Sequence, residues 1–579
     1  MKFFSHILWF CGAAVLGTAC TRHPAPKEET EILQLQTDKA CYHPGDSVTF
    51  GIDKSVSLSG LHVRYRHLNE VVDEDSLHAD SWTWMPPAVD YKGYLAEVFR
   101  RDTKGKEETL GTIAVDVSSD WSKFPRYGFL SHYAGVSQEH MEQIIDRLNR
   151  LHINGVQYQD WHWKHHRPAA GTSSCPAETW TDIALRPVEK RVVDAYIAET
   201  HRRGMLSIFY NLCFGALKDA ETDGVSPDWF LYKDKACTER DAHRLPSQWK
   251  SDIYLLDPGN AGWQRYLAQE NEKVYSLFAF DGFQIDQLGS RGIVYNAQGQ
   301  EVDLPQAYES FIRAMRTARP DKRLVMNAVS GFGQDAIARA GTDFFYNEVW
   351  ADQPQFADLA EILKENAALD STRATVFAAY MNYNVADSTG IFNTPGVLLT
   401  DAVMFALGAS HLEAGEHLLC KEYFPNNNLR TTAELDKALI AYYDFLVAYE
   451  NLLRDGGQWQ EIKVDCTDGS LKFASWPPRA GCVSVLCRQI GNKQVLHLLN
   501  TSQADKLEWR DASGTMPEPD LHTDVPISIE VARPIERVWM ASPDFHFGIP
   551  YSLEFRQKKG QVTLTLPNLK YWDIVVLEY

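Results

Sequence analysis

Residues 281–292 read DGFQIDQLGSRG, a short apolar run that ends in a carboxylate, Asp286, beside a glycine-bounded turn. Segments of this kind recur between about 121 and 455, separated by long amphipathic stretches. Eight can be picked out: RYGFLSHY, GVQYQDW, MLSIFYNLC, GFQIDQLG, RLVMNAVSG, FFYNEVW, RATVFAAYMNY and ALGASHLEAGE. Eight units of strand followed by helix in about 335 residues are typical of a (β/α)8 barrel.

The stretches between these strands predict the helices of the barrel. Residues 139–152, EHMEQIIDRLNRLH, and residues 304–318, LPQAYESFIRAMRTA, have the spacing of amphipathic helices. The third and fourth strands are unusually far apart, which predicts an insertion around 215–255.

Both flanks of the barrel show alternating apolar and polar residues with frequent turns, the pattern of antiparallel β-structure. We therefore expect a multidomain protein. A central (β/α)8 TIM barrel over 121–455 is flanked by an N-terminal immunoglobulin-like β-sandwich over 31–120 and a C-terminal antiparallel β-sandwich over 456–579.

The N-terminus predicts export. Met1 and Lys2 precede an apolar stretch that is too short for an ordinary spanning helix, and LGTAC then ends at Cys20. We interpret residues 1–20 as a lipoprotein signal peptide with Cys20 as the lipidated residue, and 21–30 as a tether; plain secretion is the alternative. The expected location is the outer membrane of a Gram-negative bacterium, on the cell surface or the periplasmic side.

Composition limits the classes of substrate that the protein can bind. A net charge of −20 and a pI near 5.4 argue against nucleic acid, which requires a basic surface. The aromatic share of 12%, with 16 Trp and 25 Tyr, suits carbohydrate, because sugar C–H faces pack on flat rings. No CxxC pair and no Cys/His cluster at ligand spacing appears, so we expect no metal and no cofactor. The cysteines beyond Cys20 are expected to be mostly buried free thiols; the alternative is a bridge among Cys466, Cys482 and Cys487.

Polar residues stand where the predicted strands end, which in a barrel is the face that carries the active site. They are His132, Asp160, Asn211, Asp286, Asn327, Glu348, Asn382 and Glu413. A full ring of such residues predicts a polar mouth.

Two carboxylates in this ring can be paired. Asp286 ends GFQID, and Glu348 ends FFYNE 62 residues later. Glycoside hydrolysis needs one carboxylate at the anomeric carbon and a second that protonates the leaving oxygen. Taken alone, the pattern also fits two structural carboxylates that cap loops.

Several motifs resemble glycoside hydrolase family 66. They are FPRYGFLSHY, INGVQYQDWHW, FDGFQIDQLG, FYNEVW and GASHLEAGEHLLCKEYFPN, in the order sandwich, barrel, sandwich. The resemblance covers nearly the whole mature chain. It implies a retaining enzyme acting on α-1,6-glucan, with Asp286 as nucleophile and Glu348 as general acid/base.

The resemblance leaves the activity open between an endo-dextranase, which releases isomaltooligosaccharides from dextran, and a cycloisomaltooligosaccharide glucanotransferase. The glucanotransferases of this family usually carry an extra carbohydrate-binding module within the barrel, and no segment here is long enough for one, which favours hydrolysis. A non-catalytic surface glycan-binding lipoprotein is a third hypothesis. Apart from glucan and a lipid anchor, no partner is predicted.

The remaining polar residues at the mouth suit sugar hydroxyls, although each also suits a structural role. The predicted substrate-binding residues are His132, Asp160, Asn211, Gln287, Asn327, Trp350 and Asn382. Trp161 and Trp163 fit either stacking on sugar or core packing. The stretch HWKHHRP (162–168) is interpreted as a basic loop, since Lys164 and Arg167 disfavour a dication. Glu413 and Glu416 are the alternative acids.

Overall fold

An eight-stranded parallel sheet occupies the middle of the chain, and its strands lie side by side in the order in which they occur in the sequence. The computed structural model describes residues 32–53 and 57–579. The strands are β8 (Tyr127–Leu130), β9 (Gly155–Tyr158), β14 (Leu206–Leu212), β18 (Gly282–Asp286), β19 (Arg323–Val329), β20 (Phe345–Glu348), β21 (Thr375–Ala378) and β23 (Ser410–Leu412). Each of the eight predicted segments contains one of them.

The sheet curls until its two ends nearly meet. The amide of Phe129 in β8 donates to the carbonyl of Ala414, just after β23, over 3.0 Å. Most residues of these strands are buried, as expected where helices cover one face and side chains fill the other. The result is a nearly closed barrel sheet whose strand ends gather at one rim.

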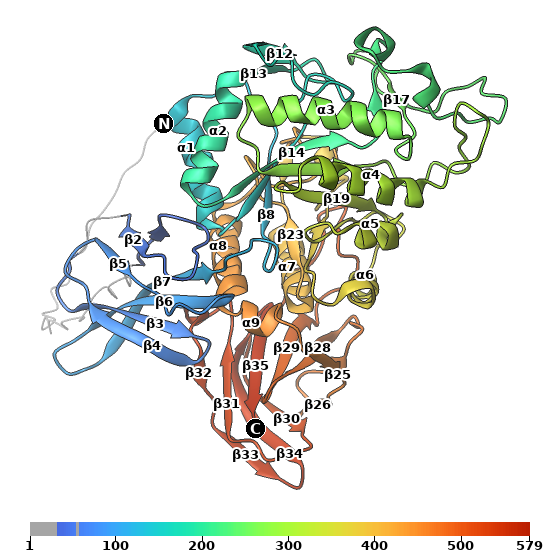
Figure 1. Ribbon diagram of the computed structural model, residues 1–579. Helices are drawn as coiled ribbons and strands as arrows, with labels where there is room; N and C mark the ends of the chain where they lie inside the picture. The colour runs from blue at the N-terminus through green and yellow to red at the C-terminus, as the bar shows by residue number, and fades with distance from the viewer. Residues whose placement is uncertain (1–31, 54–56) are drawn as a thin grey trace, which may run out of the picture. The chain divides into compact units, whose positions relative to one another are not determined.

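Helices surround the strands, as Figure 1 shows. They are α1 (Gln138–Arg150), α2 (Lys190–Arg202), α3 (Ala261–Leu277), α4 (Leu304–Ala318), α5 (Gln334–Ala340), α6 (Phe356–Asp370), α7 (Thr394–Leu407), α8 (Ala433–Ala448) and α9 (Glu450–Leu453). The two helices predicted over 139–152 and 304–318 are present as α1 and α4. Their starts are capped by side chains: Ser137 accepts from His140 N, and Asp303 accepts from Gln306 N.

The long connection between β14 and β18 contains the predicted insertion around 215–255, which precedes α3. It holds two 3₁₀ turns, η1 (Ala220–Asp223) and η2 (Pro227–Trp229), and a small antiparallel sheet. The strands of that sheet are β15 (Gly215–Ala216), β16 (Ala242–His243) and β17 (Ile253–Leu255). The insertion begins directly after β14 and therefore at the rim of the barrel.

Antiparallel sheets precede and follow the barrel. Before it, one sheet joins β1 (Leu35–Thr37), β2 (Val48–Ile52) and β5 (Ser81–Trp84), and another joins β3 (Leu61–His67), β4 (Glu70–Ser76), β6 (Lys92–Arg101) and β7 (Glu107–Val117). After it, the larger sheet includes β25 (Gln458–Gln460), β27 (Phe473–Ser475), β28 (Cys482–Ile490), β29 (Lys493–Thr501), β31 (Arg537–Ala541), β32 (Tyr551–Ser552) and β35 (Trp572–Glu578). A second sheet joins β26 (Val464–Cys466), β30 (His522–Glu530), β33 (Phe555–Lys558) and β34 (Gln561–Leu569).

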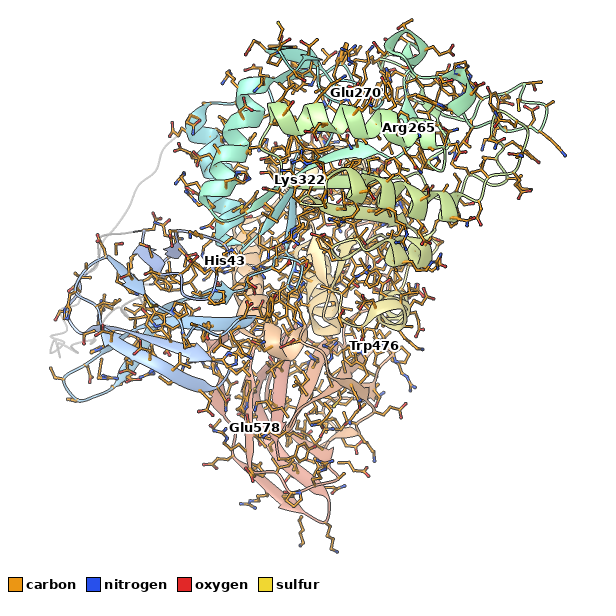
Figure 2. The ribbon with its side chains drawn as sticks, viewed as in Figure 1. His43, Arg265, Glu270, Lys322, Trp476 and Glu578 are labelled. Carbon is orange, nitrogen blue, oxygen red and sulfur yellow. The ribbon has the colours of Figure 1, made fainter. Side chains whose placement is uncertain are left out.

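A polar contact within the larger C-terminal sheet is buried. Glu578, labelled in Figure 2, accepts a 2.9 Å hydrogen bond from the indole nitrogen of Trp539, and it also pairs with Arg537. The apolar side chains of these sheets form a separate core cluster that includes Val485, Leu498 and Ile527. The C-terminal sheets thus have a core of their own.

Some expectations fall outside the described residues or fail. The signal peptide, Cys20 and the tether lie outside the described residues, and none of the described helices has the length and apolarity needed to cross a membrane. The eight described cysteines are all free thiols. Only Cys213, Cys420 and Cys487 are buried, so the expectation of mostly buried thiols is wrong.

Candidate active site

Asp286 and Glu348 end strands that flank β19, and the asparagine on β19 links them. Asn327 Nδ2 donates to Asp286 Oδ1 over 2.9 Å and to Glu348 Oε2 over 2.8 Å. These two oxygens therefore lie no farther apart than the sum of 2.9 and 2.8 Å. Because β18, β19 and β20 are adjacent in parallel register, their last residues meet at the same rim.

In each carboxylate, the oxygen that does not contact Asn327 accepts a hydrogen bond from its own tyrosine. The hydroxyl of Tyr210, on β14, donates to Asp286 Oδ2 over 2.8 Å. The hydroxyl of Tyr380, just after β21, donates to Glu348 Oε1. Each carboxylate is thus fixed by one tyrosine and by the shared amide of Asn327.

Burial and mutual repulsion separate the protonation states of the pair. Burial raises the pKa of Glu348, and the nearby charge of Asp286 raises it further, to about 7. Burial also raises the pKa of Asp286, but the hydrogen bonds donated by Asn327 and Tyr210 oppose that shift. Two like charges this close cannot both be ionised cheaply, so one proton is held on the Glu348 side near neutral pH. The pair can therefore supply an acid and an anion together.

Asp160 and His162 follow β9 at the same rim. Asp160 has a left-handed backbone, with φ of 50°, and burial raises the pKa of its carboxyl to about 7 against the opposing charge of Arg186. Within the described chain its carboxylate makes no hydrogen bond. His162 is fully buried, yet neither ring nitrogen has a hydrogen-bond partner among the described residues. A strained backbone, as at Asp160, and unsatisfied buried polar atoms, as in His162, are both typical of ligand-binding positions.

Two other predicted residues, Trp350 and His132, follow barrel strands at the same rim. The Trp350 ring lies 5.5 Å from the ring of Tyr380 and so borders the Glu348 side of the pair. His132 is exposed, and its Nδ1 lies 3.0 Å from Glu416 Oε2. Glu416, proposed as an alternative acid, also accepts from Ser131 and is occupied in holding this segment.

The structure places three predicted binding residues in internal contacts instead. Asn211 is fully buried and bonds to His165 through both ends of its amide. Gln287 accepts from Gly289 N over 2.6 Å and shapes the turn after Asp286. Asn382 is fully buried and donates to the carbonyl of Asp511 over 2.8 Å.

The histidine-rich stretch forms ion pairs. Lys164 Nζ lies 2.7 Å from Asp219 and 2.6 Å from Asp223, so an ammonium occupies the space between these carboxylates and His166. Trp161 is fully buried against Phe209 and Phe278, a core position.

The other cluster of possible metal ligands is also satisfied internally. It consists of Asp401, His411 and Glu413, all buried. His411 Nε2 donates to the carbonyl of Ala379, and its Nδ1 lies 2.8 Å from Asp401. Both ring nitrogens are thereby engaged.

Sequence reasoning missed the two tyrosines. Tyr210 immediately precedes Asn211, and side chains alternate between the two faces of a strand, so only one of these neighbours can point to the mouth. Asn211, the predicted binding residue, is the neighbour that points away from the mouth. Side chains at every second position share a face, so counting back in steps of two from the last residue of the strand would have selected Tyr210.

A family model described as glycosyl hydrolase family 66 matches residues 37–576. The chain belongs to this family. A cycloisomaltooligosaccharide glucanotransferase of Niallia circulans is 25% identical over 711 aligned positions, which cover 94% of this chain and 72% of the relative. A dextranase of Streptococcus salivarius is 24% identical over 430 positions, covering 63% of this chain and 50% of the relative.

A solved structure of a family relative has the same fold. A cycloisomaltooligosaccharide glucanotransferase of Paenibacillus sp., complexed with cycloisomaltoheptaose, superposes with a TM-score of 0.85 at 23% identity. The match covers 94% of this chain and 99% of that one. The multidomain arrangement around a nearly closed eight-stranded barrel sheet is therefore shared with a family member.

Proposed function

We propose that this protein is a retaining endo-dextranase, which hydrolyses α-1,6-glucosidic bonds within dextran and releases isomaltooligosaccharides. The observation that carries the proposal is the link through Asn327, which holds Asp286 and Glu348 at one rim with two oxygens no farther apart than the sum of 2.9 and 2.8 Å. Retaining glycosidases have carboxyl groups about 5–5.5 Å apart, whereas inverting ones need about 6.5–9.5 Å to admit a water.

In the first step, Asp286 Oδ attacks the anomeric carbon of a glucosyl unit. The bond from that carbon to the 6-oxygen of the next unit breaks, and Glu348 gives its proton to the departing oxygen. The product is a glucosyl ester on Asp286 and a shortened glucan. A pKa of about 7 keeps Glu348 protonated for this task.

In the second step, the Glu348 carboxylate takes a proton from water. The water oxygen bonds to the anomeric carbon, the ester bond breaks, and Asp286 leaves as a carboxylate. Two inversions give net retention. We assign contacts with sugar hydroxyls to His132, Asp160 and Asn327, and stacking on a glucosyl ring to Trp350. The loops that carry these groups are held in place by Asn211, Gln287 and Asn382, which do not contact the sugar themselves.

Transfer is the second candidate, because glucanotransferases are among the relatives that match most of this chain. One observation favours hydrolysis. The alignment with the Niallia enzyme runs over 711 positions although this chain has only 579 residues, so that enzyme has stretches without a counterpart here. This is consistent with the lack of an inserted carbohydrate-binding module.

The test uses dextran with the wild type, Asp286→Asn and Glu348→Gln. We expect both variants to lose at least about 10³-fold in kcat/KM, since each removes a reacting group. The matched control is Asp352→Asn, an exposed carboxylate bonded only to Ser330 among the described residues. NMR of the first reducing ends should show the α-anomer; first-formed β-anomer would exclude double displacement. Linear products indicate hydrolysis, and cyclic products indicate transfer.

We also propose export with a lipid anchor at Cys20, placing the enzyme at the outer membrane of a Gram-negative cell, on its surface or periplasmic side. Cys20→Ala should move the protein from the membrane fraction to the soluble fraction. Retention of the variant in the membrane fraction would contradict the anchor.

A further inference from the structure

A loop from the C-terminal sheets reaches the rim of the barrel. It comprises residues 502–521, between β29 and β30. Its backbone pairs with the loops that follow β20 and β21: Asn382 N donates to Arg510 O over 3.0 Å, and Phe356 N donates to Leu507 O over 2.9 Å. The loops next to Glu348 are thus held by a segment more than a hundred residues away in sequence.

The loop is firmly seated at these contacts. Trp509 is fully buried, and its indole nitrogen donates to Gln353 O over 2.7 Å, while Thr400 Oγ1 donates to Trp509 O over 2.6 Å. Asp511 accepts from the side chains of Asn382 and Asn393. This seating fixes the backbone on both sides of Arg510.

The Arg510 guanidinium lies among aromatic rings beside the acid of the pair. Its Nη2 donates to Val349 O over 2.8 Å, and its Cζ lies 5.4 Å from the Trp350 ring and 5.0 Å from the Tyr383 ring. The Trp350 ring in turn contacts Tyr380, whose hydroxyl donates to Glu348. A planar guanidinium among ring faces holds those rings in place better than a flexible ammonium does.

We propose that loop 502–521 completes the active site on the leaving-group side, with Arg510 as a positioning residue that holds Trp350 and Tyr383 as a rim for the departing glucan chain. This rests on the proposed function, in which Glu348 protonates the departing oxygen. Residues that border Glu348 away from Asp286 face the part of the substrate beyond that oxygen. Of the two rings, Trp350 is the one whose face can pack against a glucosyl ring, because the Lys421 ammonium already lies 3.6 Å from the centroid of the Tyr383 ring.

The inference predicts a dependence on the leaving group. Dextran fills the leaving-group side and needs the proton from Glu348, whereas in α-isomaltosyl fluoride the leaving group is a fluoride ion, which occupies almost none of that side and needs little protonation. We expect Arg510→Met to lower kcat/KM at least about tenfold on dextran and less than about threefold on the fluoride. Arg510→Lys keeps the charge without the flat face and should fall between the wild type and Arg510→Met on dextran.

The matched control is Arg533→Met in the same C-terminal region. Arg533 also lies over a ring, that of Tyr579, but it does so within the C-terminal sheets. This variant should match the wild type on both substrates. Thermal unfolding of each variant checks that the fold is intact.

The outcomes separate this inference from the proposed function. If the wild type cleaves both substrates and Arg510→Met loses equally on both, or on neither, the role of Arg510 is wrong and the proposed function stands. If the wild type cleaves neither, the proposed function fails and this inference fails with it. A selective loss on dextran, with an unchanged melting temperature, supports the inference.

Discussion

The hydroxyl of Tyr210 donates a 2.8 Å hydrogen bond to Asp286 Oδ2, which favours the ionised form of that carboxylate. Tyr210→Phe removes this bond, so the pKa of Asp286 should rise further above its ordinary value. Because the proposed nucleophile must be ionised to react, the acidic limb of the pH profile should move to higher pH. Hydrogen bonds to charged groups contribute about 1.5–3 kcal/mol, so kcat/KM on dextran should fall about 10- to 150-fold.

Tyr196→Phe is a suitable control for the Tyr210 variant. Tyr196 is a fully buried tyrosine whose hydroxyl has no hydrogen-bond partner among the described residues. Its loss should leave both the rate and the acidic limb unchanged. An acidic limb that stays in place in Tyr210→Phe would show that the tyrosine does not tune Asp286.

Asn327 donates from one nitrogen to both carboxylates. We therefore expect Asn327→Asp to lower activity more than removal of the side chain does. Asn327→Asp keeps the shape but replaces the donor with a third carboxyl group beside two others. Repulsion should raise the pKa values of the pair and disorder its geometry. We expect a loss of at least about 100-fold in kcat/KM, which corresponds to about 2.7 kcal/mol.

The outcome for Asn327→Asp is read against Asn327→Ala, which removes the shared donor without adding a charge. Steady-state kinetics on dextran should rank the wild type first, the alanine variant second and the aspartate variant last. Equal activity of the two variants would mean that charge at this position is unimportant. Circular dichroism checks that both are folded.

If Glu348 is the proposed acid, its raised pKa should set the alkaline limit of activity. Burial and the charge of Asp286 raise this pKa to about 7, and the proposed acid works only while it is protonated. The value of kcat/KM should therefore fall tenfold per pH unit above about 7. A profile on dextran that stays flat to pH 9 would contradict the role of Glu348 as the acid.

The barrel strands were predictable because each is a short apolar run bounded by turn residues, a signal that is local in sequence. Asp286 and Glu348 were predictable as a pair because both end such runs. The shared contact with Asn327 was not, since Asn327 lies on the strand between them and nothing local in the sequence indicates that it donates to both. The alternation of side chains along the strand would have predicted that Tyr210 points inward.

Other parts of the site have no local signal. Asn382 has a left-handed backbone, with φ of 51°, and its side chain bonds to Asp511 in the C-terminal loop. Nothing near either residue in the sequence indicates this contact. Arg510 lies in a polar stretch that resembles an ordinary connection between strands. Its position beside Trp350 follows only from how the C-terminal sheets pack on the barrel.

Asp444, on α8, joins segments that are far apart in the chain. This buried carboxylate accepts from Ala114 N in β7, from Arg150 over 2.7 Å and from His152 over 2.8 Å. Burial raises the pKa of Asp444, but the Arg150 charge and the His152 hydrogen bond outweigh burial and lower it to about 2. The ionised form is therefore part of the folded structure.

Asp444→Asn should lower the free energy of unfolding by about 3 kcal/mol, because it leaves the donors of Arg150 and His152 facing a neutral amide. Since the folded-state pKa is depressed, the stabilisation is present above about pH 4 and is lost as the pH falls toward 2. Denaturant titrations should thus show the gap between wild type and variant narrowing by about 2 kcal/mol from pH 5 to pH 2. Asp436 also lies on α8, where it forms an exposed pair with Arg147 of α1, so Asp436→Asn should change the free energy of unfolding by less than about 0.5 kcal/mol. A gap that is constant with pH would show that the Asp444 carboxylate is not held ionised by these partners.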